Sequence, residues 1–260
     1  MNFEVLSLSA YCLLFLTGFC AGFVDSIAGG GGLISLPALL FAGLPPQVAL
    51  GTNKFQGTFG ALSAALNFIQ KGQVSLKEPR TWAGIGLTFL GALSGAWAIQ
   101  RLDPSIIRHL IPVMLFMVFV YTLVSGNLGL TEQKAKLPST LFYLVFGLGL
   151  GFYDGFFGPG TGSFWTAAYM VFMGFSMTRA AGHTRIMNFA SNIVALIVFI
   201  IGGKVVFSVG LCMAAGQILG ARAGSGLAIK RGARFIRPVF MTVVFLTLLR
   251  LVYANLTANG

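Results

Sequence analysis

The sequence predicts an all-α polytopic membrane protein made of two duplicated halves, and three observations lead to this fold class. Hydrophobic residues make up 56% of the 260 residues, and the mean hydropathy is +0.86. Charged residues amount to 9%, against roughly 25% in soluble domains. Apolar runs about 20 residues long, the length of a membrane helix, recur along the chain. This composition excludes an ordinary soluble enzyme, a disordered chain and a coiled coil.

Eight apolar runs are long enough for transmembrane helices. They cover residues 5–24, 48–70, 81–100, 106–125, 138–157, 180–202, 205–229 and 235–256. Two shorter apolar runs, 33–44 and 163–177, each follow a glycine-rich stretch, and the first contains Pro37. We therefore expect eight long helices and two short segments interrupted by glycine or proline. Glu4 stands where a signal peptide would carry basic residues, so we expect no cleaved signal peptide.

The most hydrophilic gap divides the chain near its middle. It contains Glu132, Lys134 and Lys136. We therefore divide the chain into a first membrane repeat (residues 1–126), a linker loop (127–137) and a second membrane repeat (138–260).

Three sequence blocks recur in the same order at nearly constant offset, which indicates internal duplication. Residues 22–25 (GFVD) return as 151–154 (GFYD), residues 51–54 (GTNK) as 182–185 (GHTR), and residues 98–101 (AIQR) as 228–231 (AIKR). Duplicated halves with broken segments in matching places are typical of secondary transporters.

The distribution of Lys and Arg near helix ends favours a topology in which both short segments cross the membrane. If they cross, ten cations fall on one side and four on the other; if they re-enter, each side carries seven. Because cations concentrate on the cytoplasmic side, we expect inverted five-plus-five repeats with both termini outside the cytoplasm. The ten are Lys71, Lys77, Arg80, Lys134, Lys136, Arg179, Lys230, Arg231, Arg234 and Arg237, and the four are Arg101, Arg108, Lys204 and Arg250.

Four ionisable residues lie within apolar segments as two matched pairs, Asp25 with Asp154 and Lys54 with Arg185. Charged groups in membrane segments are costly and face a cavity or a partner. For the two cations, substrate contact and structural pairing are alternatives of equal weight. Each carboxylate has three possible roles, namely a carrier of a coupling proton or ion, a partner of Lys54 or Arg185, or a cap of the following turn. Pairing or capping is the favoured role.

The glycine-rich stretches are candidate anion sites, because backbone N–H groups at a helix start attract negative charge. The alternative is that glycine only permits a sharp break and close packing. Polar residues beside the glycines and cations complete the candidate site, although for Asn188 interhelical hydrogen bonding is the favoured interpretation. The predicted substrate-binding residues are Gly30, Gly31, Gly32, Thr52, Asn53, Lys54, Gly160, Thr161, Gly162, Arg185 and Asn188.

Metal, cofactor and nucleic-acid chemistry find no support in the sequence. There are two His and three Cys residues, and no CxxC motif, so we expect no metal site, no cofactor and no enzymatic activity. The net charge of +11 sits in the gaps between apolar runs, where it orients helices. We therefore expect a small anion and the lipid bilayer as partners, and no nucleic acid.

Spaced glycines at 91, 95, 216, 220 and 224 predict close helix packing.

The broken segments also carry a family resemblance. Residues 21–57, AGFVDSIAGGGGLISLPALLFAGLPPQVALGTNKFQG, and their echoes GFYDGFFGPGTGSFW and AAGHTRIMNFASN resemble the TauE/SafE family of bacterial membrane permeases, and within it the YfcA-like branch. The resemblance spans nearly the whole chain. It implies a multi-pass transporter of the bacterial inner membrane, with sulfite or organosulfur anions as the best-known substrate class.

We therefore predict a secondary transporter of a small anion, with sulfite or a related sulfur oxyanion or organosulfonate as the leading candidate. Lys54 and Arg185 would neutralise the substrate near mid-membrane, and the two repeats would alternate access to it. An anion channel and a non-transporting membrane assembly protein are the alternatives. The substrate, the direction, the coupling ion and any assembly of identical copies stay open at this point.

Overall fold

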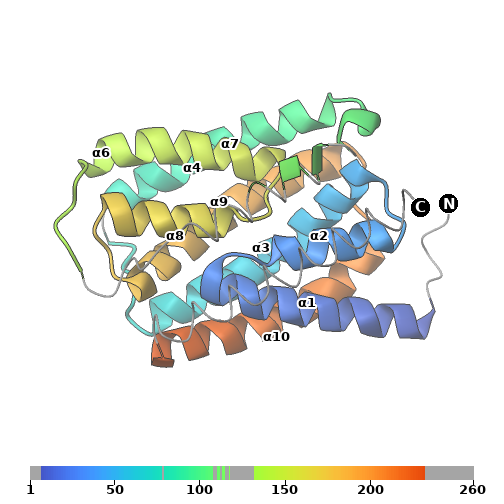
Figure 1. Cartoon of the computed structure of the whole chain (residues 1–260), viewed down its shortest axis with the longest axis horizontal. Helices are drawn as coiled ribbons and strands as arrows, with labels where there is room; N and C mark the ends of the chain where they lie inside the picture. The colour runs from blue at the N-terminus through green and yellow to red at the C-terminus, as the bar shows by residue number, and fades with distance from the viewer. Residues whose placement is uncertain are drawn as a thin grey trace.

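The computed structural model describes residues 7–77, 79–107, 110–111, 113–114, 117 and 132–231, and within these every regular element is a helix (Figure 1). The all-α class is thus confirmed for this part of the chain. The first half contains α1 (Leu8–Ala28), α2 (Gly32–Phe41), α3 (Pro46–Gln70) and α4 (Pro79–Gln100). The second contains α6 (Ser139–Phe142), the π-helical turn η1 (Tyr143–Gly147), α7 (Leu148–Phe156), α8 (Thr161–Phe172), α9 (Met177–Ile201) and α10 (Phe207–Arg231).

Among the described residues, three helices are long and apolar enough to cross a membrane: Leu8–Ile27, Pro79–Gln100 and Met177–Ile201. Helices α3 and α10 also have 25 residues each, but buried polar side chains such as Lys54 and Gln217 lower their hydropathy. The predicted span 106–125 lies largely outside the described residues, and 235–256 lies wholly outside them. The count of eight spans therefore stays a prediction.

Corresponding helices of the two halves run in opposite directions (Figure 1). Helix α1 starts at the right end of the view and α2 returns towards it, whereas α6 starts at the left end and α8 returns towards that end. Helices α3 and α9 have the same length and begin 131 residues apart, at Pro46 and Met177. The short apolar runs of the sequence appear as α2 and α8, each directly after a break in the chain.

Close backbone packing joins helices of different halves, since α1 lies along α10 and α4 lies along α7. A Cβ atom added at Gly220 of α10 would lie 2.0 Å from the backbone oxygen of Phe19, and one added at Gly95 of α4 would lie 2.1 Å from that of Phe152. Gly91, Gly216 and Gly224 have similar contacts. The predicted packing role of these glycines is confirmed.

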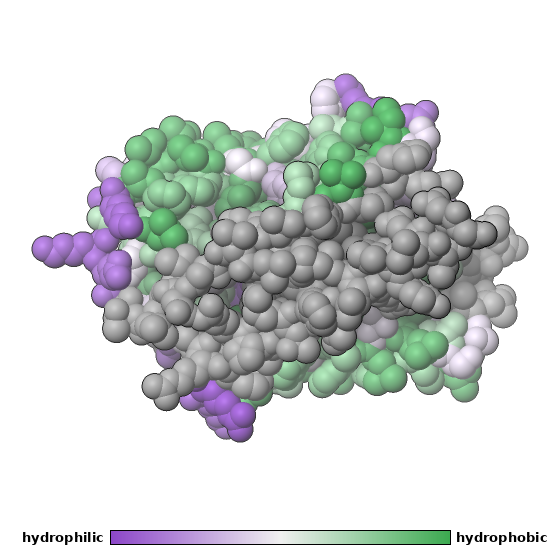
Figure 2. Space-filling view, in the orientation of Figure 1, coloured by the Kyte–Doolittle hydropathy of each residue, from purple (hydrophilic) through white to green (hydrophobic). Residues whose placement is uncertain are grey.

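Large apolar side chains are exposed along the outer helices, among them Leu13, Trp82, Leu90, Ile201 and Leu211. Figure 2 shows apolar side chains over several parts of the visible face, with hydrophilic ones gathered at its ends. Such a surface suits a lipid environment, where polar groups are confined to the interior and to the two ends.

The described cations outside the helix interiors gather at one end of the bundle. There α3 and α10 end and α4, α6 and α9 begin, and Arg179 pairs with Glu132 at 3.6 Å. This end carries Lys71, Lys77, Arg80, Lys134, Lys136, Arg179, Lys230 and Arg231, and the other end carries Arg101 and Lys204.

Candidate functional site

Two chain breaks, one from each half, meet inside the protein. The first follows α1 at Gly29, which has a φ of 85°, and the second precedes α8 at Gly160, with a φ of 84°. A Cβ atom added at Gly29 would lie 2.3 Å from the backbone carbon of Gly162, and one added at Gly162 would lie 2.5 Å from the Cα atom of Gly29. The two backbones touch, so no side chain fits between them.

A small polar cavity lies beside these breaks. Its volume of about 40 Å³ provides room for about three water molecules, each of which needs roughly 10–15 Å³ by the same measure. Helices from both halves contribute to its wall. The lining residues are Asp25, Gly29, Gly32, Ser35, Asn53, Lys54, Gly57, Asp154, Gly158, Gly160, Gly162, Asn188, Asn192 and Gln217.

Lys54 of α3 forms an ion pair with Asp154 of α7. Its Nζ atom lies 2.6 Å from Asp154 Oδ1 and also donates to the backbone oxygen of the same residue. The other carboxylate oxygen, Oδ2, accepts hydrogen bonds from Ser191 Oγ and from Asn192 Nδ2, the latter at 3.5 Å. Both charged side chains are buried, with exposed fractions of 1% and 3%.

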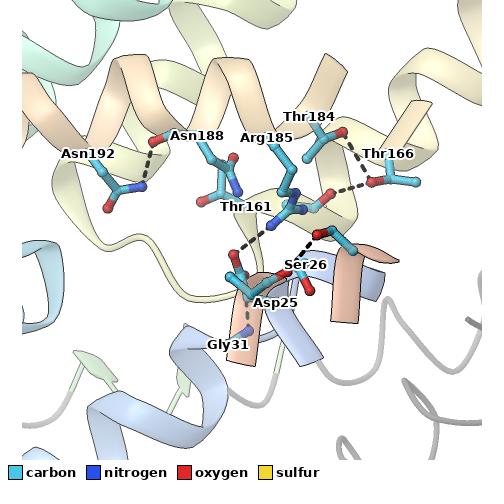
Figure 3. Close-up of polar contacts among 12 residues, drawn as sticks. Asp25, Ser26, Gly31, Thr161, Thr166, Thr184, Arg185, Asn188 and Asn192 are labelled. Atoms are coloured by element: carbon cyan, nitrogen blue, oxygen red, sulfur yellow. Dashed lines mark hydrogen bonds and ion pairs between the residues drawn. The ribbon is translucent and has the colours of Figure 1, made fainter. Parts of the chain in front are cut away.

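Arg185 of α9 forms the matching ion pair with Asp25 of α1. Figure 3 shows its guanidinium group reaching from α9 to that carboxylate, with Nη1 2.5 Å from Oδ2. Asp25 Oδ1 accepts a hydrogen bond of 3.1 Å from the backbone N–H of Gly31, at the start of α2. An anion therefore already occupies this helix start, and it belongs to the protein itself.

Each ion pair joins the two halves of the chain. The cation comes from the first half in one pair, Lys54 with Asp154, and from the second half in the other, Arg185 with Asp25. Within the described part of the chain, two cations and two carboxylates bring the formal charge of the site to zero. The sequence left open whether the cations are paired, and the structure places both in ion pairs beside the cavity.

The predicted substrate-binding residues divide into those that line the cavity and those that do not. Lys54, Asn53, Asn188 and three glycines (Gly32, Gly160 and Gly162) line it. The Arg185 guanidinium lies directly behind Gly162, since a Cβ atom there would lie 2.6 Å from Nη2.

Four predicted residues have other positions, outside the cavity lining. Thr52 Oγ1 accepts a 3.1 Å hydrogen bond from the backbone N–H of Val206, and Thr161 Oγ1 donates to Gly158 O at 2.6 Å. Gly30 and Gly31 act through their backbones, Gly30 O as an acceptor within the first turn of α2 and Gly31 N–H as the donor to Asp25.

Six lining residues were absent from the predicted set: Gly29, Ser35, Gly57, Gly158, Asn192 and Gln217. Two signals in the sequence pointed to some of them. Asn192 lies one helical turn beyond Asn188, and Gln217 is an uncharged polar residue in a helix otherwise rich in small and apolar residues. Nothing in the sequence brings α10 to this cavity, because that depends on how the halves pack.

A second, larger cavity of about 350 Å³ opens at the cation-rich end. It is lined by the segment after α3, from Gly72 to Ser75, and by Glu132, Ser176, Arg179 and His183. No group of three or more His, Cys, Asp or Glu residues suited to a metal ion occurs in the described ranges.

Apolar helices around a buried, charged cavity define the class of protein as a helical membrane protein with a polar site between its halves. Residues 14–251 match the model of the family described as sulfite exporter TauE/SafE, and the chain therefore belongs to the TauE/SafE family of membrane transporters. The predicted resemblance, including its YfcA-like branch, is confirmed.

Relatives cover nearly the whole chain. A "Probable membrane transporter protein" of Haemophilus influenzae is 43% identical over 241 residues, covering 93% of this chain and 94% of the relative. The "Probable membrane transporter protein YfcA" of Escherichia coli K12 is 40% identical, covering 93% and 89%. The Arabidopsis thaliana "Sulfite exporter TauE/SafE family protein 3" is 29% identical over 139 residues, covering 52% and 28%. No solved structure matches the chain.

Proposed function

We propose that this protein is a secondary transporter of a small oxyanion, with sulfite or a related sulfur oxyanion or organosulfonate as substrate. One observation carries the proposal: two buried cations, Lys54 and Arg185, come from opposite halves and lie at one polar cavity where two broken helices meet. Buried charges of this kind are expensive in a membrane protein and mark the path of an ion or substrate. The family description and the printed name of the Arabidopsis relative support a sulfur oxyanion.

The two cations differ in a way that suits an oxyanion. Arg185 offers a planar fork for two oxygens, and Lys54 offers a compact point charge. A cavity with room for about three waters favours a compact anion over a bulky organic one. The substrate crosses without chemical conversion, as the protein acts as a carrier and not as an enzyme.

Alternating access would follow from the arrangement of the halves as inverted repeats (1–126 and 138–260, joined by the linker 127–137). Matching helices run in opposite directions, and the ion pairs and the contact between Gly29 and Gly162 all cross between the halves. Rocking one half against the other would open the cavity first to one side and then to the other.

The uneven distribution of cations supports an orientation in the bacterial inner membrane. The end that carries Lys71, Arg80 and Arg179 would face the cytoplasm, because Lys and Arg concentrate there. The start of α1 lies at the opposite end, so both termini would lie outside the cytoplasm in the five-plus-five topology.

Counterflow of labelled sulfite in proteoliposomes tests the proposal. We expect saturable exchange by the wild type, and none above empty liposomes by the double variant Lys54→Ala/Arg185→Ala. Lys71→Ala, which removes an exposed cation outside the cavity, is the matched control and should retain exchange. Sulfate and chloride as competitors report selectivity. Currents through an open pore without counterflow would instead support the anion channel, and wild-type flux equal to that of empty liposomes would contradict sulfite as substrate.

A further inference from the structure

We infer that transport is coupled to protons and that Asp25 and Asp154 carry them: each carboxylate is a tethered anion that holds a substrate-binding cation and releases it on protonation. The inference rests on the proposed function, since it concerns the same cavity. It goes beyond that function by naming the coupling ion and the two residues that take it up.

The carboxylates hold the donors that an oxyanion would need. Arg185 Nη1 is engaged by Asp25 Oδ2, and the N–H of Gly31 at the start of α2 is engaged by Oδ1 of the same carboxylate. Lys54 Nζ is engaged by Asp154 Oδ1. A substrate oxyanion and a carboxylate therefore compete for the same hydrogen-bond donors, and binding requires the carboxylate to withdraw.

The charge of the cavity explains why a proton must accompany the anion. Lys54, Asp25 and Asp154 are the charged lining residues among those described, and Arg185, which is paired with Asp25 behind Gly162, brings the sum of the four charges to zero. The remaining titratable neighbour, Tyr153, donates its hydroxyl to the backbone oxygen of Pro159. An anion entering alone would leave an uncompensated negative charge in a medium of low dielectric constant, which is strongly unfavourable.

Protonation restores neutrality with each charge accounted for. One proton from water on one carboxylate balances a monoanion, and a proton on each balances a dianion. The neutral carboxyl group becomes a hydrogen-bond donor and needs an acceptor. Asn188 Oδ1 and Gln217 Oε1 are buried acceptors without a partner in the described part of the chain, and both residues line the cavity.

The two unpartnered oxygens support proton coupling in a second way. A cavity built for an anion alone would present donors, and a carbonyl oxygen facing a bound oxyanion would repel it. Figure 3 shows Asn188 and Arg185 extending from neighbouring turns of α9 towards the segment that contains Asp25. On this inference, Asn188 Oδ1 would accept from the Asp25 carboxylic acid once the acid has left Arg185.

The experiment measures the pH dependence of sulfite affinity in counterflow, for the wild type and for Asp25→Asn and Asp154→Asn. In the wild type, the apparent affinity should fall about tenfold per pH unit for each proton taken up, once the carboxylates are ionised. In each variant one carboxylate no longer competes with sulfite. The number of protons taken up, given by the slope of log affinity against pH, should therefore fall by one, and the affinity at alkaline pH should exceed that of the wild type. Sulfite's own titration is common to all proteins and cancels in the ratio of variant to wild type.

Asp103→Asn is the matched control, because Asp103 is exposed and lies beyond the end of α4, at the opposite end from the cation-rich surface. Its slope should equal that of the wild type. A second measurement needs no variant: liposomes that contain a pH indicator should show more protons moving with sulfite than the bisulfite fraction of the substrate itself carries, when only a sulfite gradient is imposed. This measurement tests proton coupling in the wild type, even where a variant fails to fold.

Four results would overturn the inference. Equal slopes in the wild type and both variants would show that these carboxylates take up no proton. Net sulfite uptake with no proton movement beyond that of bisulfite itself would show the same while leaving the proposed function intact. A requirement for sodium, with no proton movement, would assign the cavity oxygens to a metal cation. Absence of sulfite exchange by the wild type at every pH would overturn the proposed function, and proton coupling with it.

Discussion

Lys54 Nζ and Asp154 Oδ1 lie 2.6 Å apart although one hundred residues separate them in the chain. The pair belongs to neither half alone, and the pair of Arg185 with Asp25 repeats it with the roles of the halves exchanged. Both ion pairs therefore join the two halves. In the proposed mechanism, substrate binding, protonation and the movement of the halves would all change these two ion pairs.

Removing Lys54 should separate its structural role from its role in binding. Lys54→Ala leaves Asp154 as a buried unpaired charge, which costs about 3–5 kcal/mol. Adding Asp154→Asn removes that charge, so the double variant should recover most of the stability in thermal unfolding while sulfite counterflow stays absent. Transport by the double variant would contradict a role of Lys54 in substrate contact.

The contact between the two breaks should not tolerate a methyl group. Gly29→Ala combines a positive φ with a Cβ atom 2.3 Å from Gly162, so we expect loss of the folded, monodisperse protein in detergent. Gly43→Ala is the matched control, because Gly43 has nearly the same φ, 86°, and no heavy atom within 4 Å of the added Cβ. The control should lose only about 1–2 kcal/mol, and equal behaviour of the two variants would contradict the close approach of the breaks.

The packing of α4 against α7 can be tested in the same way within one helix. Gly95→Ala places a Cβ atom 2.1 Å from Phe152 O, whereas Gly86→Ala meets no heavy atom within 4 Å. We expect Gly95→Ala to lower the unfolding temperature, and Gly86→Ala to raise it slightly, since alanine in a helix is favoured over glycine by up to about 1 kcal/mol. The reverse order would place another surface of α4 against α7.

The orientation in the membrane predicts which positions can be labelled from outside the cell. In a variant whose native cysteines are replaced, Asp103→Cys should react with a membrane-impermeant maleimide in intact cells. Ser75→Cys, at the cation-rich end, should react only after the membrane is opened. Both positions are exposed, so accessibility within the protein does not limit the reaction. The opposite pattern would invert the proposed topology.

Much of the local structure could be predicted, because it depends on neighbours in the sequence. The predicted segments 33–44 and 163–177 overlap α2 and α8, since a run of glycines ahead of a short apolar stretch interrupts a helix. The spaced glycines of α4 and α10 pack as expected, because small residues on one face let two backbones approach. The substrate contact of Thr52 stays a prediction, and its hydroxyl oxygen accepts a hydrogen bond from the backbone N–H of Val206.

The sequence by itself determined that the protein is helical and membrane-bound, where its helices break, and that four charges lie within apolar segments in matched positions. These follow from composition and spacing, which report the environment of each residue. The tertiary structure alone decided which charge meets which. Asp25 is only 29 residues from Lys54 in the sequence, yet it pairs with Arg185, 160 residues away, because the two breaks touch. A charge buried in an apolar segment needs a partner because an unpaired one is costly. Which partner it has depends on how helices far apart in the chain pack together.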